Sequence, residues 1–448
     1  MKYFIQLFLI LMLILSCAGF KNNEVMKDPI GQTSSFVTVE GQQFMLFGEP
    51  YYFLGTNVWF AANLAAEGQR ERLKKELDLL QELGITNLRI LGASEGNGDY
   101  RIHKSFQPTL GEYDEEMMQG LDFALAEMTK RDLKAVIYLN NYWIWSGGMA
   151  QYLAWTLNKP VPNPFLGEYG WDDFMRNSGT FYGNTEAVKA HWNYVEQLVK
   201  RVNTITGIPY IEDPAIMSWQ LSNEPRPGYN QEDGFANKPS YLSWLDNTAR
   251  KIKSLDPNHL VSTGNEGTMG SVTDTDMYMD AHALESIDYA TFHLWIKNWG
   301  WYDADKPAET YPEAEQNALA YLEEHFNYAT ILNKPLTLEE FGIPRDFYEN
   351  SPGTSTEWRD RYFKTIYGAL YENAMNGGPL AGSNVWSWAG YGRPDGAEYK
   401  WDLGEDYVGD PPQEPQGLNS IFSSDSSTIR ILEEYSGKMK SLNLKRKG

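Results

Sequence analysis

The sequence has a single cysteine, Cys17, and only 6 histidines among its 448 residues. One cysteine excludes a disulfide within the chain, and so few histidines argue against a Cys/His zinc site. Basic residues are also scarce: the chain has 38 Lys and Arg but 60 Asp and Glu, which gives a net charge of −22. This charge argues against nucleic acid or an anionic membrane surface as a partner, whereas a neutral polymer is indifferent to it. We predict no cofactor and no metal.

A long apolar run occurs at the N-terminus, where residues 3–15 follow Lys2. It has about the length of a signal-peptide core and is too short to span a bilayer comfortably. The run ends in Ile14-Leu15-Ser16-Cys17, which resembles the lipobox of bacterial lipoproteins and implies lipidation of Cys17. The alternative is an ordinary secretory signal. We predict a signal peptide over 1–16, a lipidated tether over 17–35, and export to a bacterial outer membrane or cell surface, with membrane contact only through the lipid.

Aromatic residues are abundant, with 15 Trp, 28 Tyr and 20 Phe. Many of these rings belong to the core, because large rings bury much area. Flat apolar rings also stack on sugars, so the excess favours a carbohydrate ligand. The length is sufficient for one large barrel or for two to three average domains.

From residue 36 onward, apolar strand patterns alternate with amphipathic helix patterns, as in the stripe Leu73, Leu77, Leu80 and Leu83 that Gly84 closes. A small hairpin is predicted over 36–48. The predicted barrel strands are Tyr52–Asn57, Asn87–Ile90, Ala135–Leu139, Ala215–Leu221, Leu260–Thr263, Ile287–Leu294, Pro335–Glu339 and Ser383–Trp388. This alternation predicts an α/β fold over 36–448, a single (β/α)8 TIM barrel with a short N-terminal β-hairpin. An open doubly wound sheet is the alternative, but no Gly-rich phosphate turn follows the first strand.

Two segments place a glutamate at the end of an apolar run, namely Trp219–Pro225 with Glu224 and Leu336–Gly342 with Glu339 and Glu340. Strand ends are where a barrel of this kind keeps its chemistry. Cleavage of a glycosidic bond requires two carboxyl groups, one acid and one nucleophile. Each glutamate alone is more often a solvated loop charge, but the two together favour a sugar-polymer hydrolase.

These motifs resemble glycoside hydrolase family 5, and the resemblance runs from about residue 36 to the end. It implies that Glu224 is the acid/base, that Asn223 contacts the 2-hydroxyl of the sugar, and that Glu340 is the nucleophile. Glu339 could be confused with Glu340, but side chains alternate along a strand, so we expect only one to face the cleft. The resemblance also implies that Arg89 keeps the nucleophile ionised.

Further positions match the site of that family. His293 matches the histidine of strand six, and Trp386 matches the tryptophan that floors the subsite of the cleaved sugar, although Trp388 lies on the same face of the predicted strand. The details most resemble the β-mannanases, in which Arg226 reaches sugars on the leaving-group side and Glu266 belongs to the strand-five motif. The resemblance also implies that Trp59 stacks on a sugar on the non-reducing side, and that Trp143 and Trp145 extend this aromatic surface. Trp295 stands where many members carry tyrosine, and it is expected to stack on the sugar.

The resemblance implies a retaining, endo-acting enzyme that cleaves internal β-1,4-mannosidic bonds of mannan, glucomannan or galactomannan by double displacement. A β-1,4-glucanase on the same scaffold stays open, because the two sugars differ in the orientation of one hydroxyl. A surface glycan-binding lipoprotein without catalysis is the alternative of another class, but binding needs no acid–nucleophile pair. A metal-dependent hydrolase is a weaker alternative, since histidines are few.

Overall fold

The protein is described by a computed structural model that covers residues 34–395 and 401–443. The predicted signal peptide, Cys17 and most of the predicted tether lie outside the described residues. Eight parallel strands run in the spatial order β8-β7-β6-β5-β4-β11-β10-β9, and a bridge between Ser262 and Tyr289 joins the two ends. The strands are β4 (Phe53–Asn57), β5 (Asn87–Leu91), β6 (Lys134–Tyr138), β7 (Ile216–Gln220), β8 (Leu260–Ser262), β9 (Ala290–Leu294), β10 (Leu336–Phe341) and β11 (Leu380–Val385).

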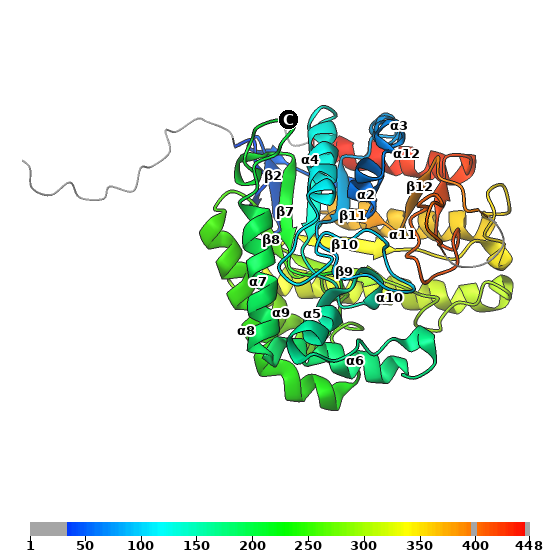
Figure 1. Ribbon diagram of the computed structural model, residues 1–448. Helices are drawn as coiled ribbons and strands as arrows, with labels where there is room; N and C mark the ends of the chain where they lie inside the picture. Colours follow the sequence, from blue (N-terminus) through cyan, green and yellow to red (C-terminus); the bar gives the residue numbers. More distant parts are fainter. Residues whose placement is uncertain (1–33, 396–400, 444–448) are drawn as a thin grey trace, which may run out of the picture. The chain divides into compact units, whose positions relative to one another are not determined.

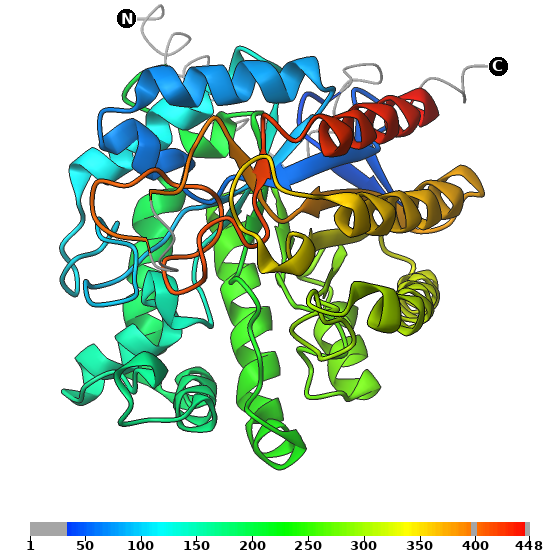
Figure 2. The same ribbon diagram turned by 90° about the vertical axis from the view of Figure 1, so that its right-hand side faces the viewer.

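Helices surround these strands (Figures 1 and 2). The α-helices are α2 (Ala61–Ala66), α3 (Arg70–Glu82), α4 (Glu115–Thr129), α5 (Gly148–Leu157), α6 (Trp171–Gly179), α7 (Thr185–Val199), α8 (Gln231–Leu255), α9 (Thr275–Ala283), α10 (Pro307–Leu332), α11 (Glu357–Met375) and α12 (Ser426–Leu442). Short 3-10 turns are η1 (Ile144–Ser146), η2 (Pro164–Leu166), η3 (Phe181–Gly183), η4 (Tyr210–Glu212) and η5 (Asp346–Tyr348). The predicted TIM-barrel fold is confirmed.

Helix α3 shows how the sequence pattern becomes packing. Its leucines at 73, 77 and 80 are buried against the barrel, and its exposed face carries charged residues. The helix ends at Glu82, and Gly84 follows with φ +78°, a left-handed conformation that glycine adopts without steric cost. Among the described residues, no helix has both the length and the apolar character needed to cross a membrane.

A small antiparallel sheet precedes the barrel and consists of β1 (Thr38–Glu40), β2 (Gln43–Leu46) and β3 (Glu49–Pro50), so the predicted hairpin gains a third strand. Phe44 packs on Phe53 and on Tyr289, with ring centroids 6.2 and 5.2 Å apart. Phe53 is the first residue of β4, and Tyr289 directly precedes β9. The hairpin therefore covers the N-terminal end of the barrel and leaves the C-terminal end for the site.

The eighth barrel strand is shorter at its C-terminal end than predicted. β11 ends at Val385, and Trp388 belongs to a separate strand, β12 (Trp388–Gly390), which pairs with β13 (Ile421–Phe422). The Trp388 indole N–H donates to Glu76 of α3 over 3.0 Å, away from the barrel mouth. The chain thus leaves the barrel before Trp388, and the two tryptophans do not share a face.

Candidate active site

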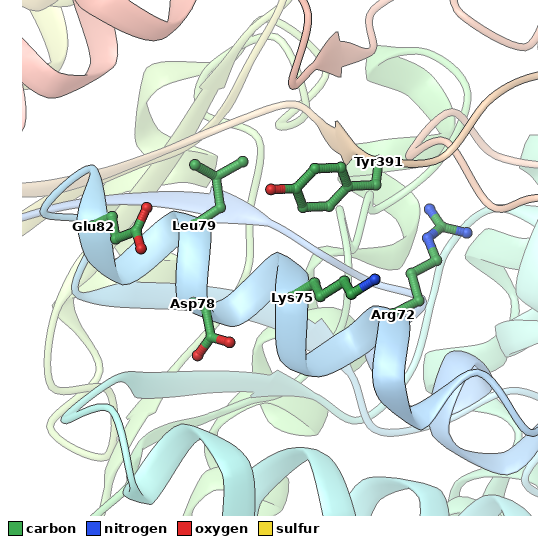
Figure 3. Close-up of a pocket in the computed structure, with 6 residues that line it drawn as sticks. All are labelled: Arg72, Lys75, Asp78, Leu79, Glu82 and Tyr391. Carbon is green, nitrogen blue, oxygen red and sulfur yellow. The ribbon is translucent and has the colours of Figure 1, made fainter.

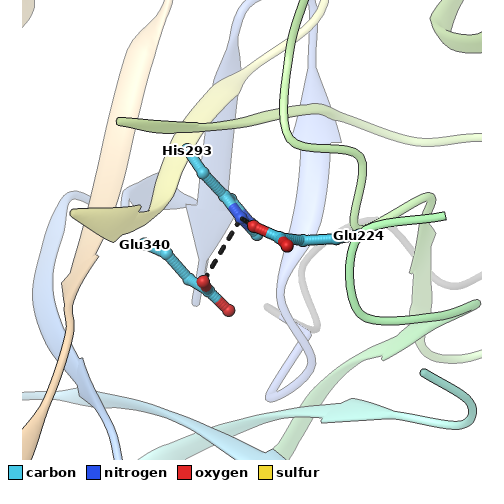
Figure 4. A group of neighbouring side chains, drawn as sticks. All are labelled: Glu224, His293 and Glu340. Carbon is cyan, nitrogen blue, oxygen red and sulfur yellow. Dashed lines mark hydrogen bonds and ion pairs between the residues drawn. The ribbon is translucent and has the colours of Figure 1, made fainter. Parts of the chain in front are cut away.

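The two predicted catalytic glutamates meet at the C-terminal end of the barrel (Figure 4). Glu340 lies in β10, and Glu224 follows β7 in a left-handed conformation with φ +47°. His293 of β9 lies between them, and its Nδ1 is 2.6 Å from Glu224 Oε1 and 3.4 Å from Glu340 Oε2. One oxygen of each carboxylate and a ring nitrogen of His293 all lie within 4.8 Å of one another. Two carboxyl groups 116 positions apart in sequence therefore come together at one place.

Arg89 of β5 forms an ion pair with Glu340. Its guanidinium is fully buried, and Nη1 lies 2.5 Å from Glu340 Oε1. The same group donates to Asn57 Oδ1 over 3.1 Å, to Gln220 Oε1 over 2.8 Å and to Asn223 Oδ1 over 2.7 Å. Because a buried guanidinium is costly unless its N–H groups are satisfied, this network fixes Arg89 and orients Asn223.

Burial and neighbouring charges shift the pKa values of Glu224 and Glu340. Burial raises the pKa of Glu340 well above its ordinary value, Arg89 opposes the shift, and the charge of Glu224 adds to it. Burial likewise raises the pKa of Glu224, and Arg226 lowers it. Such a coupled pair takes up and releases its protons as one unit. Because Arg89 contacts Glu340 directly, the negative charge belongs on Glu340 and the shared proton on Glu224.

His293 contributes no positive charge to this pocket. Burial lowers the pKa of its imidazole well below the ordinary value, and Arg89 lowers it further. Its Nε2 atom has no hydrogen-bond partner within residues 34–395 and 401–443. A neutral ring between the carboxylates orients them without neutralising either one.

Glu339 also points into the barrel, so the expected alternation of side chains fails at this point. The register of β10 on β9 shifts between Leu338 and Glu340, and this irregularity leaves Glu339 as an extra residue. Its carboxylate accepts from Gln220 Nε2 over 2.6 Å, and burial raises its pKa to about 7. Unlike Glu340, it makes no contact with His293 among the described side chains. Glu340 is therefore distinguished from Glu339 by its proximity to His293 and Glu224, and not by strand alternation.

Two tryptophans contact the predicted acid. The indole N–H of Trp143 donates to Glu224 Oε2, and the Trp295 side chain is also hydrogen-bonded to Glu224. Trp295 meets Trp386 edge-on at 6.1 Å between ring centroids. The sequence predicted only stacking at these positions. It missed the two indole donors, because the pattern of tryptophans does not reveal which edge of a ring faces a carboxylate.

Arg226 and Glu266 form an ion pair beside the acid. The guanidinium of Arg226 lies 5.1 Å from the centre of the Trp143 ring, which ties the pair to the Glu224 side of the site. Trp299 donates its indole N–H to Glu266 over 3.2 Å, and burial raises the pKa of Glu266 to about 7. The structure therefore brings the predicted residues Arg226 and Glu266 together next to Glu224.

Trp59 does not present a face to a sugar. Its side chain is 1% exposed, and its N–H donates to the carbonyl of Gly409 over 2.7 Å. Trp145 and Tyr407 pack on its ring at 5.3 and 5.4 Å. The prediction that Trp59 stacks a sugar is corrected by this burial, and Trp145, at 2% exposure, is core as well.

The segment that covers Trp59, residues 401–420, also approaches the acid. Burial, helped by the charges of Asp410 and Glu224 and opposed by Lys297, raises the pKa of Glu414 to about 8. No motif in this acidic, proline-rich loop indicates that Glu414 lies within the electrostatic reach of Glu224.

A second pocket, of about 570 Å³, lies on the flank of the barrel and contains none of the predicted site residues (Figure 3). It is lined by Arg72, Lys75, Asp78, Leu79, Glu82 and Tyr391. Most of these are side chains of α3, and Tyr391 reaches over that helix from the segment after β12.

Comparison with known proteins assigns this barrel to a class. A family model described as "GH family 5 beta-mannosidase-like" matches residues 34–444. "Putative mannan endo-1,4-beta-mannosidase 4" of Arabidopsis thaliana is 31% identical over 91% of this chain and 92% of its own. "Mannan endo-1,4-beta-mannosidase 5" of Solanum lycopersicum is 33% identical over 78% and 80%. The crystal structure of a glycoside hydrolase family 5 mannosidase from Rhizomucor miehei superposes with a TM-score of 0.83 at 34% identity, covering 92% of this chain and all of that one.

The barrel with carboxylates at its C-terminal end is therefore that of a glycoside hydrolase. More narrowly, the chain belongs to the β-mannosidase-like members of glycoside hydrolase family 5. An endo-β-1,4-mannanase from Thermotoga petrophila, with a TM-score of 0.62 at 23% identity, shares the fold.

Proposed function

We propose that the protein hydrolyses β-1,4-mannosidic bonds of mannan, glucomannan or galactomannan with retention of anomeric configuration. One observation carries this proposal, namely that oxygens of Glu224 and Glu340 lie within 4.8 Å of each other. Retaining enzymes hold their two carboxyl groups about 5–5.5 Å apart, whereas inverting enzymes need about 6.5–9.5 Å to admit a water.

In the first step Glu340 attacks the anomeric carbon while Glu224 protonates the leaving oxygen, and a glycosyl-enzyme forms. Arg89 keeps Glu340 ionised for this attack, and Asn223 is oriented by Arg89 to meet the 2-hydroxyl. Once Glu340 is esterified its negative charge is gone, so the pKa of Glu224 falls. Glu224 then removes a proton from the attacking water, and the sugar is released with its original configuration.

Replacement of the nucleophile tests the assignment. Glu340→Ala should abolish turnover and retain affinity for the glycan, and azide should rescue cleavage with formation of the inverted glycosyl azide. Unchanged turnover in this variant would show that Glu340 is not the nucleophile. The same variant separates the enzyme from a glycan-binding protein without catalysis, since in that case the wild type would bind mannan and release no product.

The spacing of Glu224, His293 and Glu340 would also fit a metal ion. The cations Arg89 and Arg226 already face these carboxylates, so a dication there would meet one buried and one partly buried positive charge. The double displacement also occupies both carboxylates. We therefore expect chelators to leave hydrolysis unchanged, and restoration of lost activity by a divalent metal would favour a metal-dependent mechanism.

We propose endo action, which is supported by the names of the relatives in Arabidopsis and tomato. Exo action is the second candidate, because residues 401–409 cover Trp59 on the side where non-reducing sugars were expected. Rapid loss of viscosity of a mannan solution would support endo action. Release of mannose or mannobiose alone would support exo action, and preference for cellulose would indicate a glucanase.

We further propose that the protein is exported and held to a bacterial membrane through a lipid on Cys17. The lipobox-like segment at 14–17 supports this proposal. Incorporation of a labelled fatty acid into the wild type, and its absence in Cys17→Ser, would support the lipid anchor. Release of unlabelled wild-type protein into the medium would indicate an ordinary secretory signal.

A further inference from the structure

A row of aromatic rings continues from the acid toward the protein surface. Trp143, which donates to Glu224, meets Trp171 edge-on with ring centroids 5.7 Å apart. Trp171 meets Phe165 at 5.3 Å, and Phe165 stacks on Tyr100 at 4.9 Å with an interplanar angle of 21°. We call Trp171, Phe165 and Tyr100 the aromatic row. Its members come from α6, η2 and the loop after β5, three segments distant from Glu224 in sequence.

The first ring of this row is open to solvent. The Trp171 side chain is 43% exposed, although a ring of this size would gain free energy from burial. The neighbouring Phe165 and Tyr100 are half-buried. An exposed tryptophan joined to two half-buried rings beside the paired glutamates is a candidate binding surface.

Local hydrogen bonds hold this row in place. The Asn163 side chain caps η2 by accepting from the Phe165 N–H over 2.9 Å, and Asp173 accepts from the Gly170 N–H at the start of α6 over 3.0 Å. Arg176 of α6 bonds to Asp233 over 3.2 Å and so links α6 to the first turn of α8. A ring on a fixed helix loses little entropy when a ligand stacks on it.

We propose that the aromatic row binds sugar units on the leaving-group side of the cleaved bond. This inference rests on the proposed function, in which Glu224 protonates the leaving oxygen. Trp143 is bonded to Glu224, and its ring lies under the guanidinium of Arg226, the residue expected on the leaving-group side, rather than on the non-reducing side where the sequence placed Trp143. The first ring of the row, Trp171, packs on Trp143. The ligand class is a neutral β-linked hexose oligomer, whose apolar C–H faces stack on aromatic rings and whose lack of charge suits a protein with net charge −22.

The test compares two substrates that fill the non-reducing side alike. An aryl mannoside whose glycone is β-1,4-mannotriose has no sugar in its leaving group, whereas mannohexaose cut in the middle places three there. Trp171→Ala should reduce kcat/KM about tenfold on mannohexaose and less than about twofold on the aryl mannoside. Trp171→Phe should restore most of the loss. Phe235→Ala is the matched control, because Phe235 of α8 is 50% exposed and has no ring contact with the row, and it should change neither value.

Equal losses on both substrates, or no loss on mannohexaose, would overturn the inference. Failure of the proposed function looks different, because the wild type would then fail to cleave β-mannosides at all. If it cleaved β-glucosides instead, the same comparison with cellohexaose would decide. If it cleaved neither, calorimetric titration of both hexaoses would decide, since an affinity unchanged in Trp171→Ala would overturn the inference and a tenfold loss would support it.

Discussion

Replacing Arg89 by methionine tests whether Glu340 owes its charge to this one side chain. The buried guanidinium lies 2.5 Å from Glu340 and 4.0 Å from Glu339, so its removal leaves two buried carboxylates without their cation. Arg226, the other cation near the pair, is engaged with Glu266. The substitution should therefore shift the pKa of Glu340 upward, beyond its effect on packing.

The size of the shift follows from Coulomb's law. Two unit charges about 4 Å apart attract by about 4 kcal/mol at an effective dielectric constant of about 20. One pKa unit corresponds to about 1.4 kcal/mol, so loss of Arg89 should raise the pKa of Glu340 by about 3 units. The nucleophile acts only when deprotonated. The acidic limb of the pH dependence of kcat/KM should therefore move to higher pH by about 3 units, with about a thousandfold lower kcat/KM on the acid side.

The assay is kcat/KM for an aryl β-mannoside across pH, measured for Arg89→Met and Arg89→Lys. Lysine keeps the charge and loses the fork of donors, so it should shift the limb less. Arg345→Met is the control, because Arg345 is equally buried and lies 2.5 Å from Asp425. Both methionine variants should lose about 3–5 kcal/mol of stability, but only Arg89→Met should move the limb. An acidic limb that stays in place in folded Arg89→Met would refute the reasoning.

Two further predictions concern protons. Trp143→Phe removes an N–H that stabilises ionised Glu224, so the pKa of the acid should rise and the basic limb of kcat/KM should move to higher pH. Burial raises the pKa of Glu95 to about 8 from 4.5, so the folded state binds this proton more tightly, and stability should fall by up to about 1.4 kcal/mol per pH unit between about pH 5 and 8. Glu95→Gln should remove part of that slope in urea unfolding at several pH values, and an unchanged slope would contradict it.

The barrel could be predicted from the sequence because local patterns coincide with its elements. Each strand reads as a short apolar run, and each helix carries one apolar stripe, as in α3 with its terminal Gly84. The topology then follows from alternation alone, since parallel strands with helical connections close into a barrel. The strand end at 385–388 was misjudged, because Trp386 and Trp388 continue the apolar pattern although the chain leaves the barrel before Trp388.

The site divides into a part that the topology dictates and a part that it does not. That Glu224 and Glu340 come together could be predicted from sequence, because a barrel gathers the C-terminal ends of its strands, whichever loops connect them. Trp59 was misassigned because its burial depends on Gly409 and Tyr407, about 350 positions away. The direction of Glu339 depends on a register shift between β9 and β10, which leaves no mark on the sequence of either strand.

This division explains where the specificity of the enzyme must lie. The groups proposed to act on the bond stand on strands or directly after them and are fixed by the barrel, as the ion pair of Arg89 on β5 with Glu340 on β10 shows. The rings available to bind sugars stand on the connecting segments, where Trp143 and Trp171 face the site or solvent while Trp59 is covered. Exchange of one connecting segment can therefore change which sugars bind without disturbing the acid and the nucleophile. Burial, and not the number of tryptophans, decides which rings a sugar can reach.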